Sequence, residues 1–484
     1  MSSAFVFLLG IIFITTVILL LNCGQMSNDR TVQSVVHSRN EQRDDSNWIT
    51  LSSNTYSPGT VVRRVPMLIY ASYFYYISPE LIGFQAIGFS FCRKMQDTTE
   101  LILLRKTYAL NPEPLQFGCP DETGCEWANM RLQAEIPLQT SVPKNIALKT
   151  ATSTVNVPVQ ESVMHERVDG LEVCVAPLYW HNQWMRLIEF VELYQAQGVS
   201  HFYIYVSSVS QIVNDILKIY EKKGVVSIVY WPSLPQLGPI DPNAGVFRLG
   251  QGTAHMACMM KSKAKFVAMI DLDDYIVIHG PDNSLLDYLT AESAKDPSIG
   301  SFQFERSMVQ QPMEDVANNW ENFTLDHLES APICDSCQDN FKSIVLPDKV
   351  DVSSTHFPVS HRAIRETPGA TYRSMMVPRT AGVCYHARYA LDKTQNYSEV
   401  AYTTQQFHAS THVDRLRTNL PDLMKELGAK HQNLSIPDAT DYMNTCTKYV
   451  VNVCQTPYHT CPKMNDLDEW VYGDNVVQSS YVLI

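Results

Sequence analysis

The sequence predicts an α/β fold whose central sheet is mostly parallel, and three observations lead to this class. Short apolar, β-branched runs alternate with amphipathic helical segments between residues 169 and 280. Strands that alternate with helices of this size form crossover units, which place successive strands parallel to one another. One of the apolar runs ends in three carboxylates, Asp271, Asp273 and Asp274. A length of 484 residues allows two or three domains, or one large domain with appendages.

The predicted elements follow in order from residue 171. Strands are expected at 171–176, 201–206 and 225–230, and a further buried strand begins at Ala264 and ends in the carboxylates. A helix is expected over 184–197, where apolar residues recur at the spacing of one buried face, and Gly198 ends it. A second helix precedes Gly224, and a third spans about 252–261.

The carboxylates indicate a metal site. Because side chains on an extended chain alternate faces, Asp271 and Asp273 would project to the same side just past a buried strand. Their mutual repulsion would be removed by Mg²⁺ or Mn²⁺, which also bind phosphate oxygens. Ligands of parallel α/β sheets bind beyond the carboxyl ends of the strands, so a metal-bound nucleoside diphosphate fits best. The alternative for this copy is an ordinary strand end with exposed aspartates. A second D-x-D, at 466–468, has no apolar strand before it and is interpreted as a solvated loop.

The N-terminal part predicts attachment to a membrane. Residues 4–21 form an uncharged apolar run, which as a helix would span ~27 Å, close to the thickness of a bilayer. Only three residues precede it and the cleavage pattern is poor, so an uncleaved signal anchor over 1–22 is favoured over a signal peptide. A polar stem follows at 23–60, and a β-rich region with a linker at 61–168.

Charge and cysteines limit the partners and the compartment. The net charge of −13 and the absence of a long basic run argue against nucleic acid. Among 12 cysteines, close pairs such as Cys119 with Cys125 and Cys334 with Cys337 are typical of disulfides in a secretory-pathway protein, with Cys258 expected to be a free core thiol. Three N-x-S/T sequons, at Asn322, Asn396 and Asn433, agree with a lumenal location.

Several stretches together resemble a known family. They are Cys174-Val175-Ala176-Pro177-Leu178-Tyr179, Trp184 with 188–192, 198–205, Gln251, Cys258, 271–274, 342–345, His356, and His386 with Arg388. In order and spacing they resemble the metal-dependent glycosyltransferases of the GT-A fold, and more closely glycosyltransferase family 92. The likeness covers roughly residues 170–420, so we expect a GT-A-like nucleotide-sugar-binding domain at 169–420 and a separate cysteine-containing region at 421–484.

The resemblance implies an activity and roles for residues. It implies inverting transfer of a hexose, with UDP-galactose as the expected donor, to a glycan or glycoprotein such as the core fucose of an N-glycan. It also implies Mn²⁺ (or Mg²⁺) as cofactor and a lumenal catalytic domain in the Golgi. The expected residues are Asp273 and Asp271 for metal and donor, His386 and then His356 as further metal ligands, and Gln251 and Lys342 for the donor. Glu305 is the expected catalytic base with Glu314 and Asp315 as rivals, and Asp274 is a second expected catalytic residue.

Two departures from the family pattern leave alternatives open. Family members commonly carry Asn-Asp where this chain has Met256-Ala257, and they tend to have Glu where Asp274 stands. One alternative is therefore a membrane-anchored glycan-binding protein of the same fold without turnover. Another is a nucleotidyltransferase, although the Gly-rich, basic phosphate loop typical of such enzymes is missing near the N-terminus. The sequence does not predict the oligomeric state.

Overall fold

The computed structural model describes most of the chain from residue 67 onward, and all described residues belong to one compact unit, Tyr56–Ile484. The described residues are 67–91, 99–115, 125–137, 142–151, 153–160, 167–237, 241–279, 284–311, 325–337, 340–356, 358–389, 402–428, 454, 470–477 and 481–483. Within them, no helix is both long and apolar enough to cross a bilayer. The expected anchor, the stem and the three sequons lie outside the described residues.

Seven strands at the N-terminal side close into a small β-barrel. Hydrogen-bonded pairs run β1–β2–β5–β4–β3–β6–β7 and return to β1 through a short parallel contact at Ser72 and Tyr73. The strands are β1 (Leu68–Ser78), β2 (Leu81–Phe91), β3 (Thr99–Leu103), β4 (Lys106–Pro114), β5 (Trp127–Pro137), β6 (Asn145–Lys149) and β7 (Thr154–Gln160). Alternating apolar residues such as Phe84 and Leu132 form one buried cluster of the barrel. The short strand β23 (Val482–Leu483) adds to β1 from the far end of the chain.

Four parallel strands form the part of the second sheet that was predicted. They are β8 (Val168–Leu178), β9 (Val199–Val206), β11 (Val226–Tyr230) and β12 (Ala264–Met269), paired in the order β11-β9-β8-β12. The connecting helices α2 (Trp184–Ala196), α3 (Gln211–Lys222) and α4 (Gln251–Lys261) confirm the three predicted helices within one or two residues. Because the strand order reverses between β8 and β12, the carboxyl ends of these two strands form the switch point where α/β sheets bind ligands.

The sheet as a whole is mixed, so the prediction of a mostly parallel sheet was wrong. Beyond β12, strand β16 (Phe341–Val345) pairs antiparallel to β12, and β14 (Ile299–Gln311) antiparallel to β16. The sheet continues with β15 (Ser330–Cys334) and β21 (Thr403–Gln406), while β19 (Arg373–Met376) and β20 (Gly382–Tyr389) run parallel to β14. The helical periodicity that predicted parallel crossovers ends at residue 261, and most of the later strands are joined without long helices.

The run over 264–278 contains two strands, and Asp271 and Asp273 follow the end of the first, as predicted. A turn interrupts it after Met269, and the chain resumes as β13 (Asp274–Ile278), which pairs with β20 instead of continuing the central sheet. The first acidic side chains therefore lie in a turn, and the third lies at the start of a new strand.

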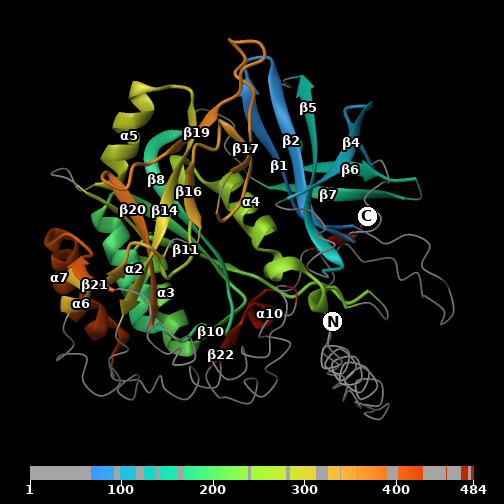
Figure 1. The fold of residues 1–484 in the computed structure, drawn as a ribbon. Helices are drawn as coiled ribbons and strands as arrows, with labels where there is room; N and C mark the ends of the chain where they lie inside the picture. Colours follow the sequence, from blue (N-terminus) through green and yellow to red (C-terminus); the bar gives the residue numbers. More distant parts are fainter. Residues whose placement is uncertain are drawn as a thin grey trace, which may run out of the picture. The chain divides into compact units, whose positions relative to one another are not determined.

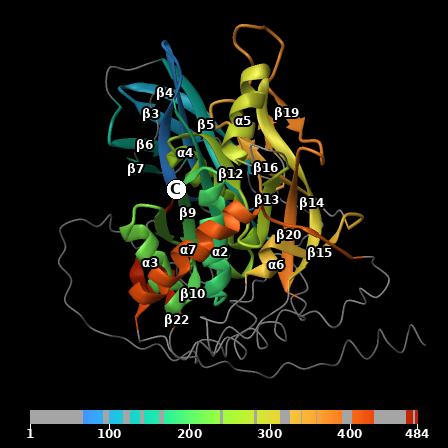
Figure 2. The ribbon, with the colours of Figure 1, turned by 90° about the vertical axis from the view of Figure 1, so that its left-hand side faces the viewer.

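Helices cover both faces of the sheet. On one face, α2 and α3 join the larger apolar core, and α7 (Ser410–Leu427) packs across α2, as Figure 2 shows. On the other face, α4 lies between the sheet and the barrel, in a second apolar core that includes strands β1 and β2 (Figure 1). A buried arginine of the barrel, Arg131, also pairs with Asp351 at 2.7 Å. The barrel therefore packs directly on the helix that precedes the acidic turn.

The remaining elements are short. They are β10 (Ser208–Ser210) with β22 (Trp470–Tyr472), β17 (Val350–Ser353) with β18 (Pro358–His361), α5 (Leu285–Lys295), α6 (Asp326–Glu329) and α10 (Gly473–Val476).

The cysteines pair differently from two of the expectations. Cys258 is not a free thiol, because it forms a buried disulfide with Cys174 that joins α4 to β8. Cys125 forms a disulfide with Cys454, 329 residues later in the sequence, and not with Cys119. The expected disulfide Cys334–Cys337 is confirmed. Among the described cysteines the free thiol is Cys384, which is buried on β20. Sequence distance misled the first two expectations, since folding brings together cysteines that lie far apart in the chain.

Candidate functional site

The three aspartates lie at the switch point of the sheet, in and directly after the turn between β12 and β13. The turn is closed by a hydrogen bond from the Asp274 amide to the Asp271 carbonyl, at 3.1 Å. It is held against β20 because the Ala387 amide donates to the Asp273 carbonyl at 2.7 Å, and Arg186 of α2 donates to the carbonyl of the same Ala387. The backbone thus places Asp273 beside His386, the neighbour of Ala387.

Asp274 is a buried charge with several ionic partners. Its side chain has no exposed surface, yet Lys342 Nζ lies 2.8 Å from Oδ2, and Arg306 Nε lies 3.2 Å from Oδ1. The imidazole of His386 contacts the same Oδ1 through Nδ1, at 2.9 Å. Burial acts to raise the pKa of Asp274, but Lys342, His386 and Arg306 outweigh it and hold the pKa far below its usual value. Asp274 therefore stays ionised and orients the side chains of Lys342, Arg306 and His386 around the turn.

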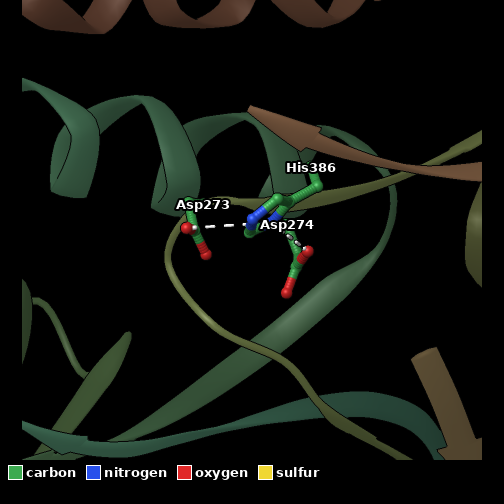
Figure 3. Close-up of side chains that lie close together, drawn as sticks. All are labelled: Asp273, Asp274 and His386. Atoms are coloured by element: carbon green, nitrogen blue, oxygen red, sulfur yellow. Dashed lines mark hydrogen bonds and ion pairs between the residues drawn. The ribbon is translucent and has the colours of Figure 1, made fainter. Parts of the chain in front are cut away.

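Asp273 faces the same nitrogen of His386 from a greater distance, and its side chain is a third exposed. Its Oδ2 is 3.7 Å from His386 Nδ1, as the dashed line in Figure 3 shows. Burial and the neighbouring Asp274 and Asp271 raise the pKa of Asp273, although His386 acts to lower it. A carboxylate whose charge is opposed by its neighbours gains from a bound cation.

Asp271 is the most exposed of the three carboxylates, with 40% of its side chain accessible, and it is paired with Lys342 at 2.6 Å. Burial acts to raise the pKa of Asp271, but the opposing effect of Lys342 prevails, so this pKa lies below its usual range. Lys342, which was expected to contact the donor, is fully buried between Asp271 and Asp274. Both carboxylates raise the pKa of this ammonium above its usual value, against the effect of burial.

Asp273, Asp274 and His386 form the group that could hold a metal ion among the described residues. One potential ligand atom from each lies within 4.8 Å of the others. Two carboxylates and an imidazole suit Mn²⁺, which accepts both oxygen and nitrogen ligands. The donor set therefore fits the divalent ion that the resemblance implies, with Asp273 accessible from outside and Asp274 holding His386 in place.

The other expected residues lie at varying distances from this group. His356 is half-buried and contacts the Phe341 carbonyl through Nδ1 at 3.1 Å; burial and Lys342 lower its pKa, and it is not part of the metal-competent group. Gln251 is buried as the first residue of α4. The roles of both stay predictions.

Glu305 is not brought to the aspartates. On β14, Phe304 pairs with Lys342 and Arg306 reaches Asp274, so the alternation of the strand directs Glu305 to the opposite face. There its carboxylate pairs with Arg379 at 3.2 Å. Its rivals Glu314 and Asp315 lie outside the described residues, and the identity of the base stays a prediction.

Sequence reasoning missed several residues of the site. His255 of α4 is completely buried, and Asp271, Lys342 and His356 all influence its pKa. Arg306 of β14 and Arg186 of α2 are buried cations. A charged residue inside an apolar strand needs a buried partner, and this signal was available for Arg306 and Lys342.

Met256 and Ala257, where family members commonly carry Asn-Asp, lie inside α4. Both side chains are fully buried in the apolar core that α4 shares with the barrel strands. They are therefore packing residues of α4 and do not line an open site.

The parallel part of this α/β sheet carries carboxylates and a histidine at its switch point, where such sheets bind ligands, and the donor set fits a divalent ion. Residues 169–427 match the model of glycosyltransferase family 92, which is more than half of the chain. The chain belongs to this family, and the resemblance stated from the sequence is confirmed.

Individual relatives are distant. Glycosyltransferase family 92 protein F13G3.3 of Caenorhabditis elegans is 25% identical over 242 residues, which cover 48% of this chain and 46% of that protein. Protein F55C10.4 of the same family and organism is 25% identical over 210 residues, covering 40% and 37%. The chain thus matches less than half the length of these relatives. The crystal structure of S. aureus TarS 1-349 shares 14% identity and a TM-score of 0.21 over 37% of this chain and 47% of that chain, too low to support an argument.

Proposed function

We propose that this glycosyltransferase moves a hexose from a UDP-sugar, UDP-galactose being the expected donor, to a hydroxyl of a glycan such as the core fucose of an N-glycan. We also propose that the reaction depends on Mn²⁺, and that the enzyme works in the Golgi lumen behind an N-terminal anchor. The observation that carries the proposal is the group Asp273, Asp274 and His386 at the switch point of the sheet. The disulfides Cys174–Cys258 and Cys125–Cys454 support an oxidising compartment.

The chain's own residues divide the work at this site. Asp273 and His386 would hold the metal, and Asp271 lies within the same turn with its side chain partly exposed. Asp274 fixes the His386 ring through the 2.9 Å contact, while Lys342 and Arg306 balance its charge. When bound, a divalent ion would neutralise the diphosphate and stabilise the charge that develops on the leaving group.

The transfer itself needs one more group. In an inverting reaction the acceptor oxygen bonds to the anomeric carbon as the bond to UDP breaks, and a base takes the acceptor proton. Asp274 is fully ionised but buried and engaged by cations, which favours a positioning role for it over proton transfer. The base must therefore come from elsewhere in the chain.

The test is UDP release by the purified lumenal part, residues 60–484, from a panel of UDP-hexoses with a glycan array as acceptor. We expect activity with Mn²⁺, its loss with a chelator, and its loss in Asp273→Ala with the fold intact. Asp287→Ala, a change in the first turn of α5, is the matched control and should keep full activity. An active Asp273→Ala variant would refute the site, and a wild-type chain that binds glycans without releasing UDP would favour the binding-protein alternative.

A further inference from the structure

Three residues with unusual backbone conformations lie near the switch point. Among the described non-glycine residues, five have a positive φ: Leu104, Arg105, Trp180, Arg248 and Leu249. Leu104 and Arg105 form the two-residue turn between β3 and β4, where a positive φ is the normal geometry. The other three are not in a hairpin, and such conformations persist only where the surrounding structure imposes them.

The strained residues lie at the edge of the sheet that carries the aspartates. Trp180 is two residues past the end of β8, the strand beside β12. The carbonyl of Leu249 accepts a hydrogen bond at 2.9 Å from the indole of Trp231, the first residue after β11. Because β8, β11 and β12 run parallel, their carboxyl ends share this edge. The left-handed turn at 248–250 therefore belongs to the same end of the sheet as Asp271.

The β-barrel holds this turn from outside the catalytic fold. Asn129 of β5 is buried and donates to the Phe247 carbonyl on one side of the turn, at 3.5 Å. On the other side its Oδ1 accepts from the Thr253 amide at 3.2 Å and from the Thr253 hydroxyl at 3.0 Å. Next to it, the Trp127 amide donates to the Gly245 carbonyl at 3.1 Å. One barrel side chain thus brackets the turn on both sides.

The turn carries an exposed arginine. Arg248 is exposed although Gly250 and Gln251, which follow it, are buried. Its charge acts on Tyr179, at the end of β8: burial and then Asp271 raise the pKa of that tyrosine, Arg248 lowers it, and Asp273 raises it. Arg248, Asp271 and Asp273 thus all act on the same side chain, at the end of the strand that pairs with β12.

Arg248 differs from the other cations near the aspartates. Lys342 and Arg306 are buried against Asp274, and Arg379 is paired with Glu305 and Asp335. Within the described part of the chain, no carboxylate pairs with Arg248; its guanidinium lies 5.6 Å from the Phe247 ring. An exposed guanidinium at the same edge of the sheet as a metal-competent carboxylate site is suited to bind phosphate oxygens in two parallel hydrogen bonds.

We propose that Arg248 binds the diphosphate of the donor opposite the acidic turn, and that the barrel positions it through Asn129. The inference rests on the proposed function for the donor class. It also assigns a role to the barrel, which lies outside the segment 169–427 that matches the family. Arg248 is the binding residue, and Asn129 is a positioning residue that does not itself contact the donor.

The test is calorimetric titration of the purified protein in Mn²⁺ with pyrophosphate, UDP and uridine. Since a charge-assisted hydrogen bond contributes about 1.5–3 kcal/mol, Arg248→Ala should weaken the binding of pyrophosphate and of UDP by about 10- to 150-fold. Uridine and Mn²⁺ alone should bind as in the wild type, and Arg248→Lys should restore part of the loss. Arg105→Ala is the matched control, because Arg105 is also exposed and has a positive φ, but lies in the barrel hairpin.

Asn129→Leu tests the positioning role. It should weaken pyrophosphate and UDP in the same direction but less than Arg248→Ala, with no further loss when the two changes are combined. Unchanged pyrophosphate binding in Arg248→Ala, an equal loss of uridine binding, or a wild type that does not bind pyrophosphate would each overturn the inference. Sugar transfer by an Arg248→Ala variant with wild-type UDP affinity would overturn it while leaving the proposed function intact. If pyrophosphate binding depends on Arg248 but no UDP-hexose is turned over, then the inference stands and the proposed function fails.

Discussion

The ammonium of Lys342 and the carboxylate of Asp274 form an ion pair of 2.8 Å in which neither side chain is exposed. Lys342 also contacts Asp271 at 2.6 Å, so one buried cation bridges the partly exposed turn and the start of β13. The pair therefore connects β16, which carries Lys342, to both ends of the acidic turn. It stabilises the site in the absence of any bound metal, because it offsets the repulsion among three neighbouring carboxylates.

Removing this cation should destabilise the fold. Breaking a buried ion pair leaves an uncompensated charge and typically costs about 3–5 kcal/mol. We expect Lys342→Met to lower the free energy of unfolding by about 3 kcal/mol, since Arg306 and His386 still contact Asp274. Lys149→Met is the matched control: its partner Glu100 lies 2.9 Å away, but both side chains are well exposed, and the cost should stay below about 1 kcal/mol. Urea unfolding measures both, and equal costs would contradict a structural role for Lys342.

The alternation of strands and helices was enough to predict the parallel part of the sheet and the place of Asp271 and Asp273 at its carboxyl edge. It could not predict that Asp274 is buried, because this depends on the chain turning at residue 270 and pairing with β20 more than a hundred residues later. The contact of Lys342 with Asp271 likewise joins residues 71 apart in the chain. The antiparallel pairing of β14 and β16 involves no helical crossover, so helical periodicity could not predict their positions in the sheet. Local periodicity does not encode these long-range pairings.

The disulfide between Cys174 and Cys258 should contribute strongly to stability. It closes a loop of 84 residues, for which the loss of chain entropy in the unfolded state predicts about 4–5 kcal/mol. Cys174→Ala with Cys258→Ala should therefore lower the unfolding free energy by roughly that amount. The matched control removes Cys334 and Cys337, which are three residues apart and for which the same relation predicts about 2 kcal/mol. Denaturant unfolding of the two double variants should rank them in this order, and the reverse order would refute the loop-closure account.

Stability should fall as the pH drops below 6.5, and His255 should contribute to the fall. Burial lowers the pKa of this imidazole to about 4, with Lys342 and His356 acting in the same direction and Asp271 against it. Its pKa in the unfolded chain is about 6.5, so between these values the unfolded state binds the proton and the folded state does not. The stability is complete above pH 6.5 and is lost as the pH falls towards 4, by about 3 kcal/mol in total.

The measurement is the unfolding free energy of metal-free wild type and His255→Gln from pH 4 to 8, with a chelator present. The variant should show a shallower decline below pH 6.5. Above pH 7 the two curves should run parallel, because the imidazole is neutral in both states there. Identical slopes between pH 4 and 6.5 would show that His255 is protonated as easily in the folded protein as in the unfolded chain.

The packing of the barrel against the turn before α4 can be tested at Gly250. Its φ is +81°, and an added Cβ would lie 2.7 Å from two ring atoms of Phe89 on β2. Gly224 is the matched control, because its φ of +75° is similar but nothing lies within 4 Å of an added Cβ. Alanine in a left-handed conformation costs roughly 1–2 kcal/mol at both positions, and overpacking adds about 1–3 kcal/mol at Gly250 alone. Urea unfolding of Gly250→Ala should therefore show the larger loss, and Phe89→Leu should reduce the difference when combined with it. If the two alanine variants lose equal stability, then the barrel does not constrain this turn through Phe89, and glycine is required at residue 250 for its backbone conformation only.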